Sequence, residues 1–519
     1  MFRRNRSLQA SVTVFASLSL LLIASFLLVL LEAARVKGLA AYSRMQRTNA
    51  MESVFSRYDR ELFEKYGIFL LDGSAGSETL QFSQINADLQ SVSQKNLRPV
   101  ISGIMWDQIQ NFYQMDVTEA SVTGFLLATD EKGGPFRQMA VDSMKARYPF
   151  ELAQGLYDRL RSSDQAMTQA SQSESAMDQA QENIQAAKEA QAAKKAQAAQ
   201  EAAGGQQEAQ PPALEGTTDQ PVENPMDVVK SIKHVDVLTL VMPSGGNLSA
   251  KAVRGRQTLE HRQLLQGNEP WKKNGGWYEA VVYQQFLQTQ FASYEPGKSG
   301  EGALDYELEY IHAGKKSDRE NLKCVVQQLL LLREGANFMY LQTDAAKQQE
   351  AYSVAAALAA AVCIAPATGL IAQGILAAWA YAESVLDVRT LLAGGKIAWM
   401  KTAESWSSSL SGLGSLLAGS ARAKEQENGD DYKSYLQKLL WLNSERALNY
   451  RAMDLMEFQA EMSGRTIRMD AMLLALRADI SHEAKPLFSE LVTLQRLHAD
   501  VWEFSDSAYY SYFSDSERK

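Results

Sequence analysis

The clearest pattern in the chain is an uncharged apolar segment close to its N-terminus. No residue from 7 to 31 carries a charge, and residues 12–31 are mostly apolar. About 20 apolar residues, at a rise of about 1.5 Å each, cross the roughly 30 Å hydrocarbon core of a bilayer. The segment therefore predicts a transmembrane helix. Arg3, Arg4 and Arg6 precede it, which favours a cytoplasmic N-terminus and an extracytoplasmic location for the bulk of the chain.

A cleaved secretory signal is the alternative interpretation of this segment. Such a signal has a shorter apolar core that ends at a small-residue cleavage site. Here the apolar run continues directly into residues 32–35, Glu-Ala-Ala-Arg, so we expect an uncleaved anchor. No cysteine follows the apolar core, which argues against a lipoprotein anchor.

Helical spacing continues beyond the predicted membrane segment. Apolar residues recur mainly at steps of three and four, and Gly67 is expected to end this helix because glycine readily adopts the left-handed conformation. The apolar stripe of this stalk must pack either on the globular part of the chain or on neighbouring copies. Its members are Leu39, Tyr42, Met51, Phe55, Tyr58 and Leu62.

The rest of the chain predicts a helix-rich α+β fold in several segments. After residues 1–66, which hold the cytoplasmic tip, the transmembrane helix and the stalk, we expect a first globular segment at 67–162. Residues 163–225 combine an Ala/Gln-rich solvated helix or spacer with a flexible linker at 204–225, which contains four prolines. Residues 226–519 are expected to form a helix-rich α+β region.

Individual elements follow from the period of the apolar residues. We expect strands at 68–71, 117–127, 235–242, 304–310 and 502–513, and helices at 321–333, 344–365, from 370 onward, and at 432–461. Asp305, Glu307 and Glu309 alternate with apolar residues and are assigned to the solvated face of their strand.

A second uncharged stretch, at residues 351–382, is long enough to cross a bilayer. It is rich in alanine, which adds little transfer free energy, and Pro366 and Gly369 interrupt it. We therefore favour a buried pair of shorter helices, with a second membrane span as the alternative.

The composition excludes several classes of function. The net charge of −9 argues against a nucleic-acid partner, and two cysteines exclude a disulfide-stapled scaffold and a Cys-rich zinc module. Nucleotide-binding, zinc-protease and hydrolase motifs are missing from the sequence. Glu260–His261 and His482–Glu483 could supply a general base, but adjacent residues on a helix point apart. We expect no catalytic residue, no cofactor and no metal, and Cys324 and Cys363 could either pair or remain free thiols.

Glu32 and Arg35 are the candidate site residues, because they stand at the expected edge of the membrane. A carboxylate at the lipid boundary can contact a basic group of a neighbouring subunit. The alternative, which physical reasoning favours, is that Glu32 and Arg35 pair with each other at the outer interface.

Several stretches resemble a known group of membrane proteins. Residues 11–15 (Ser-Val-Thr-Val-Phe), the leucine run and residues 31–36 resemble the start of the TadE/TadG-like pseudopilins of tight-adherence (Flp-type) pili. The whole chain is similar to an uncharacterised clostridial family often encoded beside tight-adherence pilus components. Further stretches that carry this resemblance are residues 58–60 with 65–69, 134–138 with Met144 and Lys145, 306–310 with Gly314, Lys315, Asp318, Asn321 and Leu322, and 380–384 with Asp387 and Arg389.

The resemblance implies a non-enzymatic, single-pass structural component of a pilus or secretion assembly. Its partners would be the lipid bilayer and other membrane proteins of that assembly, or further copies through the stalk helix. Ala10 precedes Ser11 where a processed prepilin has glycine, and Phe15 stands where major pilins have glutamate, so a permanently embedded role is expected. The alternatives are a cell-surface adhesin or sensor and, second, a membrane-tethered hydrolase.

Overall fold

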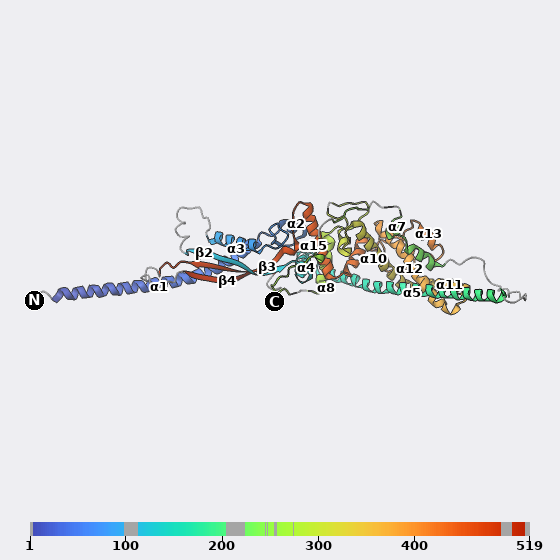
Figure 1. Ribbon diagram of the computed structural model, residues 1–519, viewed down its shortest axis with the longest axis horizontal. Coiled ribbons are helices and arrows are strands. Elements are labelled where there is room, and N and C mark those ends of the chain that lie inside the picture. Colours follow the sequence, from blue (N-terminus) through green and yellow to red (C-terminus); the bar gives the residue numbers. More distant parts are fainter. Residues whose placement is uncertain are drawn as a thin grey trace. The chain divides into compact units, whose positions relative to one another are not determined.

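The computed structural model describes residues 4–97, 113–203, 224–243, 245, 248–253, 257–272, 275–300, 302–488 and 501–513. The fold is α+β and rich in helix, as predicted. It contains two compact units (Figure 1). Unit 1 comprises residues 1–143, 262–274 and 463–519, and unit 2 comprises residues 144–261 and 275–462. The structure therefore divides the chain differently from the linear segments expected from the sequence.

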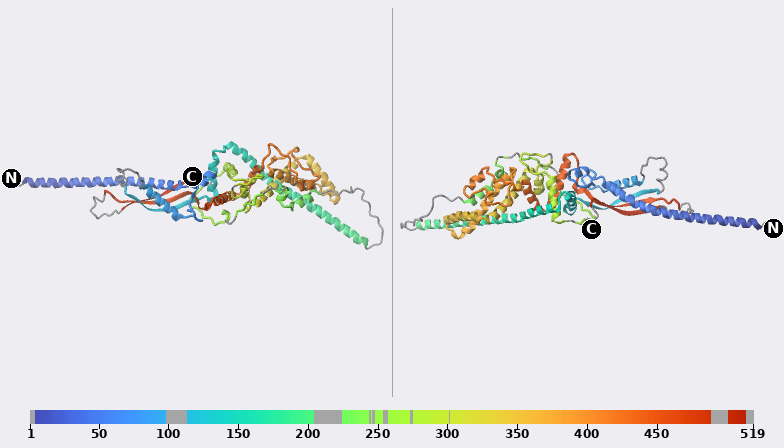
Figure 2. Two further views of the ribbon diagram at one scale, coloured as in Figure 1. Left: turned by 90° about the horizontal axis from the view of Figure 1, so that it is seen from above. Right: turned by 180° about the vertical axis from the view of Figure 1, so that it is seen from behind.

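Unit 1 contains a long N-terminal helix and a small sheet. Helix α1 extends beyond the sheet toward the N-terminus (Figures 1 and 2). The elements are α1 (Arg4–Phe55), α2 (Arg60–Tyr66), β1 (Leu71–Asp72), α3 (Phe82–Leu97), β2 (Met115–Leu127), α4 (Asp130–Lys145), η3 (Met469–Ala471), β3 (Met472–Ala484) and β4 (Trp502–Ser511).

Helix α1 changes character along its length. Apart from Leu28, which is partly buried, the large apolar side chains between Val12 and Leu31 are about half or more exposed, and from Glu32 onward one side of the helix is buried. The helix is long and apolar enough to cross a membrane, which makes it a candidate anchor.

The stalk does not continue as one helix to Gly67, which corrects that prediction. Helix α1 ends at Phe55, and the short helix α2 starts at Asp59, whose carboxylate accepts the N–H of Leu62 as an N-cap. Gly67 ends α2 with φ of 70°, in the left-handed region predicted for it. Polar residues 56–59 therefore divide the predicted stalk in two.

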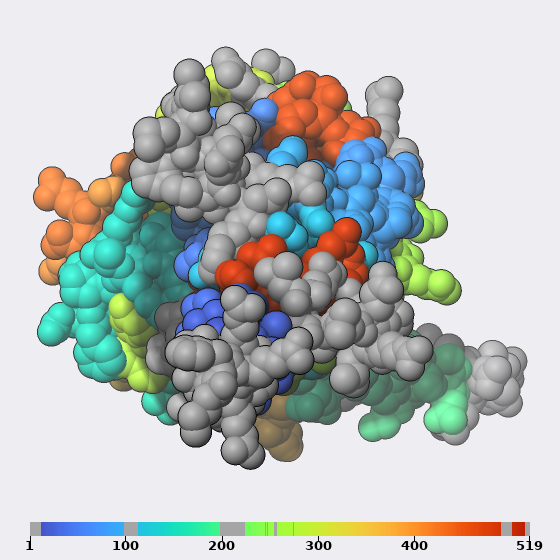
Figure 3. Space-filling model, turned by 90° about the vertical axis from the view of Figure 1, so that its left-hand side faces the viewer, coloured from blue at the N-terminus to red at the C-terminus, as the bar shows by residue number. Residues whose placement is uncertain are grey.

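The sheet of unit 1 is antiparallel, with β3 paired to β1, β2 and β4. Strands β2 and β4 confirm the predictions for 117–127 and 502–513, and β1 is shorter than the strand expected at 68–71. The central strand β3 was not predicted. Figure 3 looks at unit 1 from the side of the N-terminus, with strands in cyan and red beside α3 in blue.

Helices α1 and α3 cover one face of this sheet. The buried side chains between them include Met51, Phe55, Leu89, Leu476 and Ile480. Because side chains of a strand alternate between its two faces, Arg477, Asp479, Ser481 and Glu483 point to the other face.

The described residues of unit 2 form helices joined by loops, with isolated β-bridges but no strand. Its elements are α5 (Phe150–Ala203), α6 (Pro225–Lys233), α7 (Val237–Val241), η1 (Leu259–His261), α8 (Trp277–Gln290), α9 (Glu307–Ala313), α10 (Asp318–Leu341), α11 (Ala345–Ala361), η2 (Ala365–Ala367), α12 (Thr368–Leu392), α13 (Leu413–Ala418), α14 (Tyr432–Trp441) and α15 (Glu445–Met462).

The Ala/Gln-rich helix α5 is not fully solvated, which corrects the prediction for 163–203. One side packs on α10 and α12 through small residues spaced by three and four, including Ala166, Ala170 and Ala180. A Cβ built on Gly335 would lie 1.8 Å from the carbonyl oxygen of Ala166. Because alanine has low hydropathy, its close packing was not visible in the apolar pattern. The flexible linker predicted at 204–225 lies almost entirely outside the described residues.

Residues 351–382 form two helices joined by a turn at η2, which contains Pro366. Of the apolar window in Ala365–Leu392, 83% is buried inside the protein. Helix α12 packs against α5, α10 and α11 of unit 2. The favoured interpretation as a buried pair of helices therefore matches the position of α12.

Two predicted strands are wrong, because each segment contains part or all of a helix and no strand. Residues 235–242 contain α7, and residues 304–310 lead into α9. The acidic side chains of Asp305, Glu307 and Glu309 are buried rather than solvated.

Candidate functional site

Glu32 and Arg35 lie at the point where α1 joins the sheet of unit 1. Both are almost fully buried, and Arg35 Nη1 lies 3.0 Å from Glu32 Oε1. Glu32 also accepts hydrogen bonds from the backbone N–H of Phe488, at 2.8 Å, and from the indole N–H of Trp502, at 3.0 Å. The carboxylate thus links α1 to residues that flank β3 and β4.

Arg35 binds the same region through backbone oxygens. Its guanidinium donates to the carbonyl of Lys485 at 2.9 Å and to that of Tyr113 at 2.7 Å. Glu32 and Arg35 therefore pair with each other, as physical reasoning favoured. A contact between subunits through these two residues stays a prediction.

His482 is a second buried polar group of unit 1. Its Nδ1 lies 3.0 Å from Ser43 Oγ of α1, and its Nε2 lies 3.3 Å from Ser93 Oγ of α3. Burial, together with the positive charge of Arg47, lowers the pKa of His482 to about 4. The imidazole is enclosed by two helices and is on the opposite sheet face from Glu483, so it joins elements rather than facing a cleft.

In unit 2, the acidic residues of the 306–322 stretch bind backbone N–H groups. Asp318, at the start of α10, accepts the N–H of Asp305 at 2.9 Å and that of Tyr306 at 3.1 Å. It also accepts the hydroxyl of Ser249 at 2.6 Å. Burial raises the pKa of Asp318. This carboxylate therefore fixes the loop that enters α9.

Glu307 and Glu309 act in the same way on the segment that follows α8. Glu307 accepts the N–H of Ala292 at 2.8 Å, and Glu309 accepts the N–H of Tyr294 at 2.8 Å. Glu309 also accepts the hydroxyl of Tyr432 at 2.7 Å. Complete burial raises the pKa of Glu309 to about 7, despite these hydrogen bonds.

A buried ion network connects α10, α12 and the loop after α12. Asp387 lies 2.9 Å from Arg333 Nη2 and 2.7 Å from Lys401 Nζ. Lys401 also pairs with Glu383 at 2.7 Å, and Glu383 accepts the N–H of Ser408 at 2.8 Å. All four charged side chains of this network are inaccessible to solvent. Their pairing is needed because an isolated charge in such surroundings is costly.

Arg389, two residues after Asp387, donates to backbone carbonyl groups among the described residues. Its guanidinium donates to Leu240 at 2.8 Å and to Leu417 at 2.6 Å, and it also reaches the carbonyls of Leu416 and Ala421. It thereby holds the ends of α7 and α13 against α12. The motifs at 306–322 and 380–389 therefore have structural roles that the sequence did not indicate.

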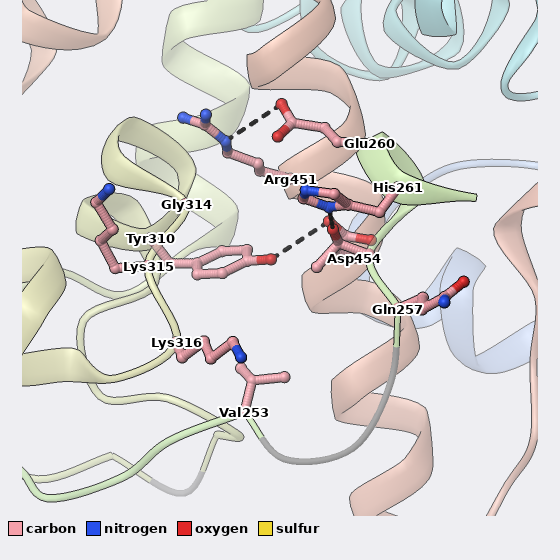
Figure 4. A pocket seen from close by; sticks show the side chains of 11 residues that line it. Val253, Gln257, Glu260, His261, Tyr310, Gly314, Lys315, Lys316, Arg451 and Asp454 are labelled. Carbon is pink, nitrogen blue, oxygen red and sulfur yellow. Dashed lines mark hydrogen bonds and ion pairs between the residues drawn. The ribbon is translucent and has the colours of Figure 1, made fainter.

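A pocket of about 530 Å³ lies in unit 2 beside α9, α15 and η1 (Figure 4). Tyr310 donates to Asp454 at 3.3 Å, and Arg451 Nε lies 3.5 Å from Glu260. The residues that line the pocket are Val253, Gln257, Thr258, Glu260, His261, Tyr310, Gly314, Lys315, Lys316, Arg451 and Asp454.

Glu260 and His261 both line this pocket, contrary to the expectation that neighbours point apart, because η1 is a single tight turn. His261 Nδ1 lies 2.8 Å from Thr258 Oγ1. Among the described residues no hydrogen bond joins His261 to a carboxylate, the contact that orients a histidine base in catalytic triads. Glu309, whose pKa is near 7, does not line the pocket.

The described part of the chain bears on metal binding and on the state of the two cysteines. There, no three His, Cys, Asp or Glu residues are grouped so that they could hold a metal ion. Cys324 and Cys363 are free thiols, and Cys363 is exposed. The choice between paired and free cysteines is thus answered in favour of free thiols.

Comparison with protein families gives one match, which covers residues 215–484, more than half of the chain. It is described as a family of unknown function, DUF5702. The chain belongs to this family. Neither a curated protein nor a solved structure matches it. The DUF5702 region includes the carboxylate and arginine networks of unit 2, the pocket and strand β3, and it excludes α1, β2 and all of α5.

Proposed function

We propose that this protein is a single-pass membrane-anchored structural component of a tight-adherence-type pilus or secretion assembly. In this proposal residues 12–31 cross the membrane, the N-terminus is cytoplasmic, and both units are extracytoplasmic. The protein has no enzymatic role, and it acts by holding other components of the assembly, or further copies of itself, at the membrane surface.

One observation carries this proposal, namely the change of exposure along α1. The same helix exposes its apolar side chains before residue 32 and buries one side in unit 1 afterwards. Exposed leucine, isoleucine and phenylalanine side chains throughout residues 12–31 require an apolar environment. Because α1 is part of the core of unit 1, that unit would stand directly on the lipid surface.

The junction at Glu32 and Arg35 gives further support. Buried charges with several hydrogen bonds hold α1 firmly on the sheet, so the anchor is not a loosely tethered tail. A rigid connection of this kind suits a component that transmits position or force. The resemblance to TadE/TadG-like pseudopilins supplies the kind of assembly.

Labelling of cysteines on intact cells tests the proposed topology. Cys363 is naturally exposed, and a second reporter is made by Asn5→Cys in a Cys324→Ser/Cys363→Ser background. A membrane-impermeant maleimide should label Cys363 on intact cells and should label the residue-5 reporter only after permeabilisation. The Cys363→Ser variant is the matched control for reagent specificity.

Two results would contradict the proposal. Labelling of the residue-5 reporter on intact cells, with Cys363 protected, would reverse the topology. Recovery of the mature chain in the soluble fraction without residues 12–31 would remove the anchor. The assembly role is tested separately, because the tagged protein should co-purify with tight-adherence ATPase or platform proteins, and isolation as a lone monomer would oppose it.

A further inference from the structure

The sheet of unit 1 has a second face that neither α1 nor α3 covers. Glu503 of β4 lies directly opposite Glu483 of β3, and Glu119 of β2 lies opposite Ser481 of β3. The side chains of these residues are on the same face of the sheet as Asp479. We call Glu119, Asp479, Glu483 and Glu503 the acidic face. None of the four forms an ion pair with a residue that the structure describes, and like charges placed directly opposite weaken a sheet. Arg477 lies on the same face, two residues before Asp479 in β3, and its guanidinium already donates to the carboxylate of Glu269 at 2.6 and 2.9 Å.

Helix α1 has a basic strip on its outer side. Lys37 and Arg44 are exposed, and neither forms an ion pair with a described residue. Between residues 33 and 48 they are the exposed charged residues, because Arg35 and Arg47 are buried against the sheet. We call Lys37, Ala41, Arg44, Met45 and Thr48 the outer strip.

The outer strip and the acidic face lie at the same level along unit 1. Arg35 binds the carbonyl of Lys485, and Arg47 donates to that of Ile480 at 3.3 Å. Lys37 and Arg44 therefore lie alongside residues 480–485 of the β3 region. The seven helical steps from Lys37 to Arg44 span about 10 Å, and the four strand steps from Asp479 to Glu483 span about 13 Å, so the spacing of opposite charges also agrees.

We propose that a second copy of this chain lays its outer strip on the acidic face of the first. The inference rests on the proposed function, because insertion of residues 12–31 gives every copy the same height above the bilayer. The strip and the face lie on opposite sides of unit 1, so the contact repeats in one direction and builds a row instead of a closed dimer. Single exposed ion pairs are weak, but confinement to a membrane raises the effective concentration of the partners.

Disulfide cross-linking in native membranes tests this contact without changing any charge. In the Cys324→Ser/Cys363→Ser background, Ala41→Cys places a thiol in the outer strip and Ser481→Cys places one in the acidic face. The double variant should give covalent dimers and a ladder of larger species on mild oxidation. A mixture of the two single variants should stop at the dimer. The control pair Ser56→Cys and Ser481→Cys, at different levels, should not cross-link.

Charge reversal tests whether electrostatics position the copies. Adding Lys37→Glu and Arg44→Glu to the cross-linking variant should reduce dimer formation about fivefold, as expected for the loss of roughly 1 kcal/mol. Combining them with Glu483→Lys and Glu503→Lys should restore it. Unchanged thermal midpoints of the reversed chains show that the fold is intact.

Three outcomes would overturn the inference. They are failure of the Ala41→Cys/Ser481→Cys chain to cross-link, insensitivity to charge reversal, and cross-linking to a different protein, identified by mass spectrometry, instead of a second copy. Labelling of Cys363 on intact cells separates the two proposals. If that topology holds and cross-links are missing, the side-by-side contact fails while the proposed function stands.

Discussion

The imidazole Nδ1 of His482 lies 3.0 Å from the hydroxyl oxygen of Ser43, although 439 residues separate the two in sequence. The contact joins the long N-terminal helix to the central strand of unit 1. A neutral imidazole can donate one hydrogen bond and accept another, which suits a position between two hydroxyl groups. A charged imidazole would be disfavoured here, because the positive charge of the buried Arg47 guanidinium would repel it.

We predict that His482 makes the stability of unit 1 depend on pH. Because its pKa falls from 6.5 to about 4 on folding, the unfolded chain binds more protons between these values. Its contribution is therefore complete above pH 6.5 and is lost as the pH falls toward 4. Thermal unfolding of the detergent-solubilised chain at several pH values should show a shallower dependence for His482→Asn. An unchanged pH dependence in this variant would contradict the prediction.

The junction between α1 and the sheet should be sensitive to loss of the Glu32 charge. Glu32→Gln leaves Arg35 buried without its carboxylate, and breaking such a pair costs about 3 kcal/mol. Denaturant unfolding followed by a probe of unit 1 measures this loss. Glu52→Gln, an exposed position on the same helix, serves as control and should stay within about 0.5 kcal/mol of wild type.

The close approach of α5 and α10 should not tolerate a side chain at Gly335. A Cβ there would overlap the Ala166 carbonyl, so Gly335→Ala requires the two helices to separate and should destabilise unit 2 by about 2 kcal/mol. Gly155→Ala provides the matched control. Gly155 is also helical but has no atom within 4 Å of a built Cβ, and alanine there should be neutral or stabilising by about 0.5–1 kcal/mol. Equal melting temperatures for the two variants would argue against the tight contact.

The buried network around Asp387 should respond far more strongly than a surface pair. Asp387→Asn leaves Arg333 and Lys401 with reduced compensation in the core, and we expect a loss of about 3–5 kcal/mol. Glu295→Gln removes an exposed pair with Lys298 and should cost at most about 0.5 kcal/mol. Calorimetric unfolding compares the two, and similar small effects would show that the network is dispensable.

The elements that the sequence predicted well were those with one strong signal. The apolar run before Glu32 and the aromatic-rich segment that contains β4 are examples. Strand β3 was missed because residues 472–476 are buried continuously, a pattern that a helix can also produce. Residues 304–310 alternate at the period of a strand, yet residues 307–310 begin α9, and Asp305, Glu307 and Glu309 bind polar groups inside the protein.

The candidate site was predictable only in part. The pairing of Glu32 with Arg35 follows from their i, i+3 spacing on one helix. Their bonds to Trp502 and Lys485 depend on contacts more than 400 residues away in sequence, which local patterns cannot reveal. The pocket around Tyr310 and Asp454 likewise combines three separate stretches of unit 2.

The interleaved path of the chain imposes an order on biosynthesis. The ribosome releases α1, α3 and β2 first, then all of unit 2, and only afterwards β3 and β4. Until β3 and β4 emerge, β2 has no described strand to pair with, and residues 32–55 of α1 have no sheet to cover their apolar side. In a nascent chain that is already inserted in lipid, unit 1 would therefore remain incomplete while unit 2 is being synthesised. Premature termination would leave an unprotected substrate for membrane quality-control proteases.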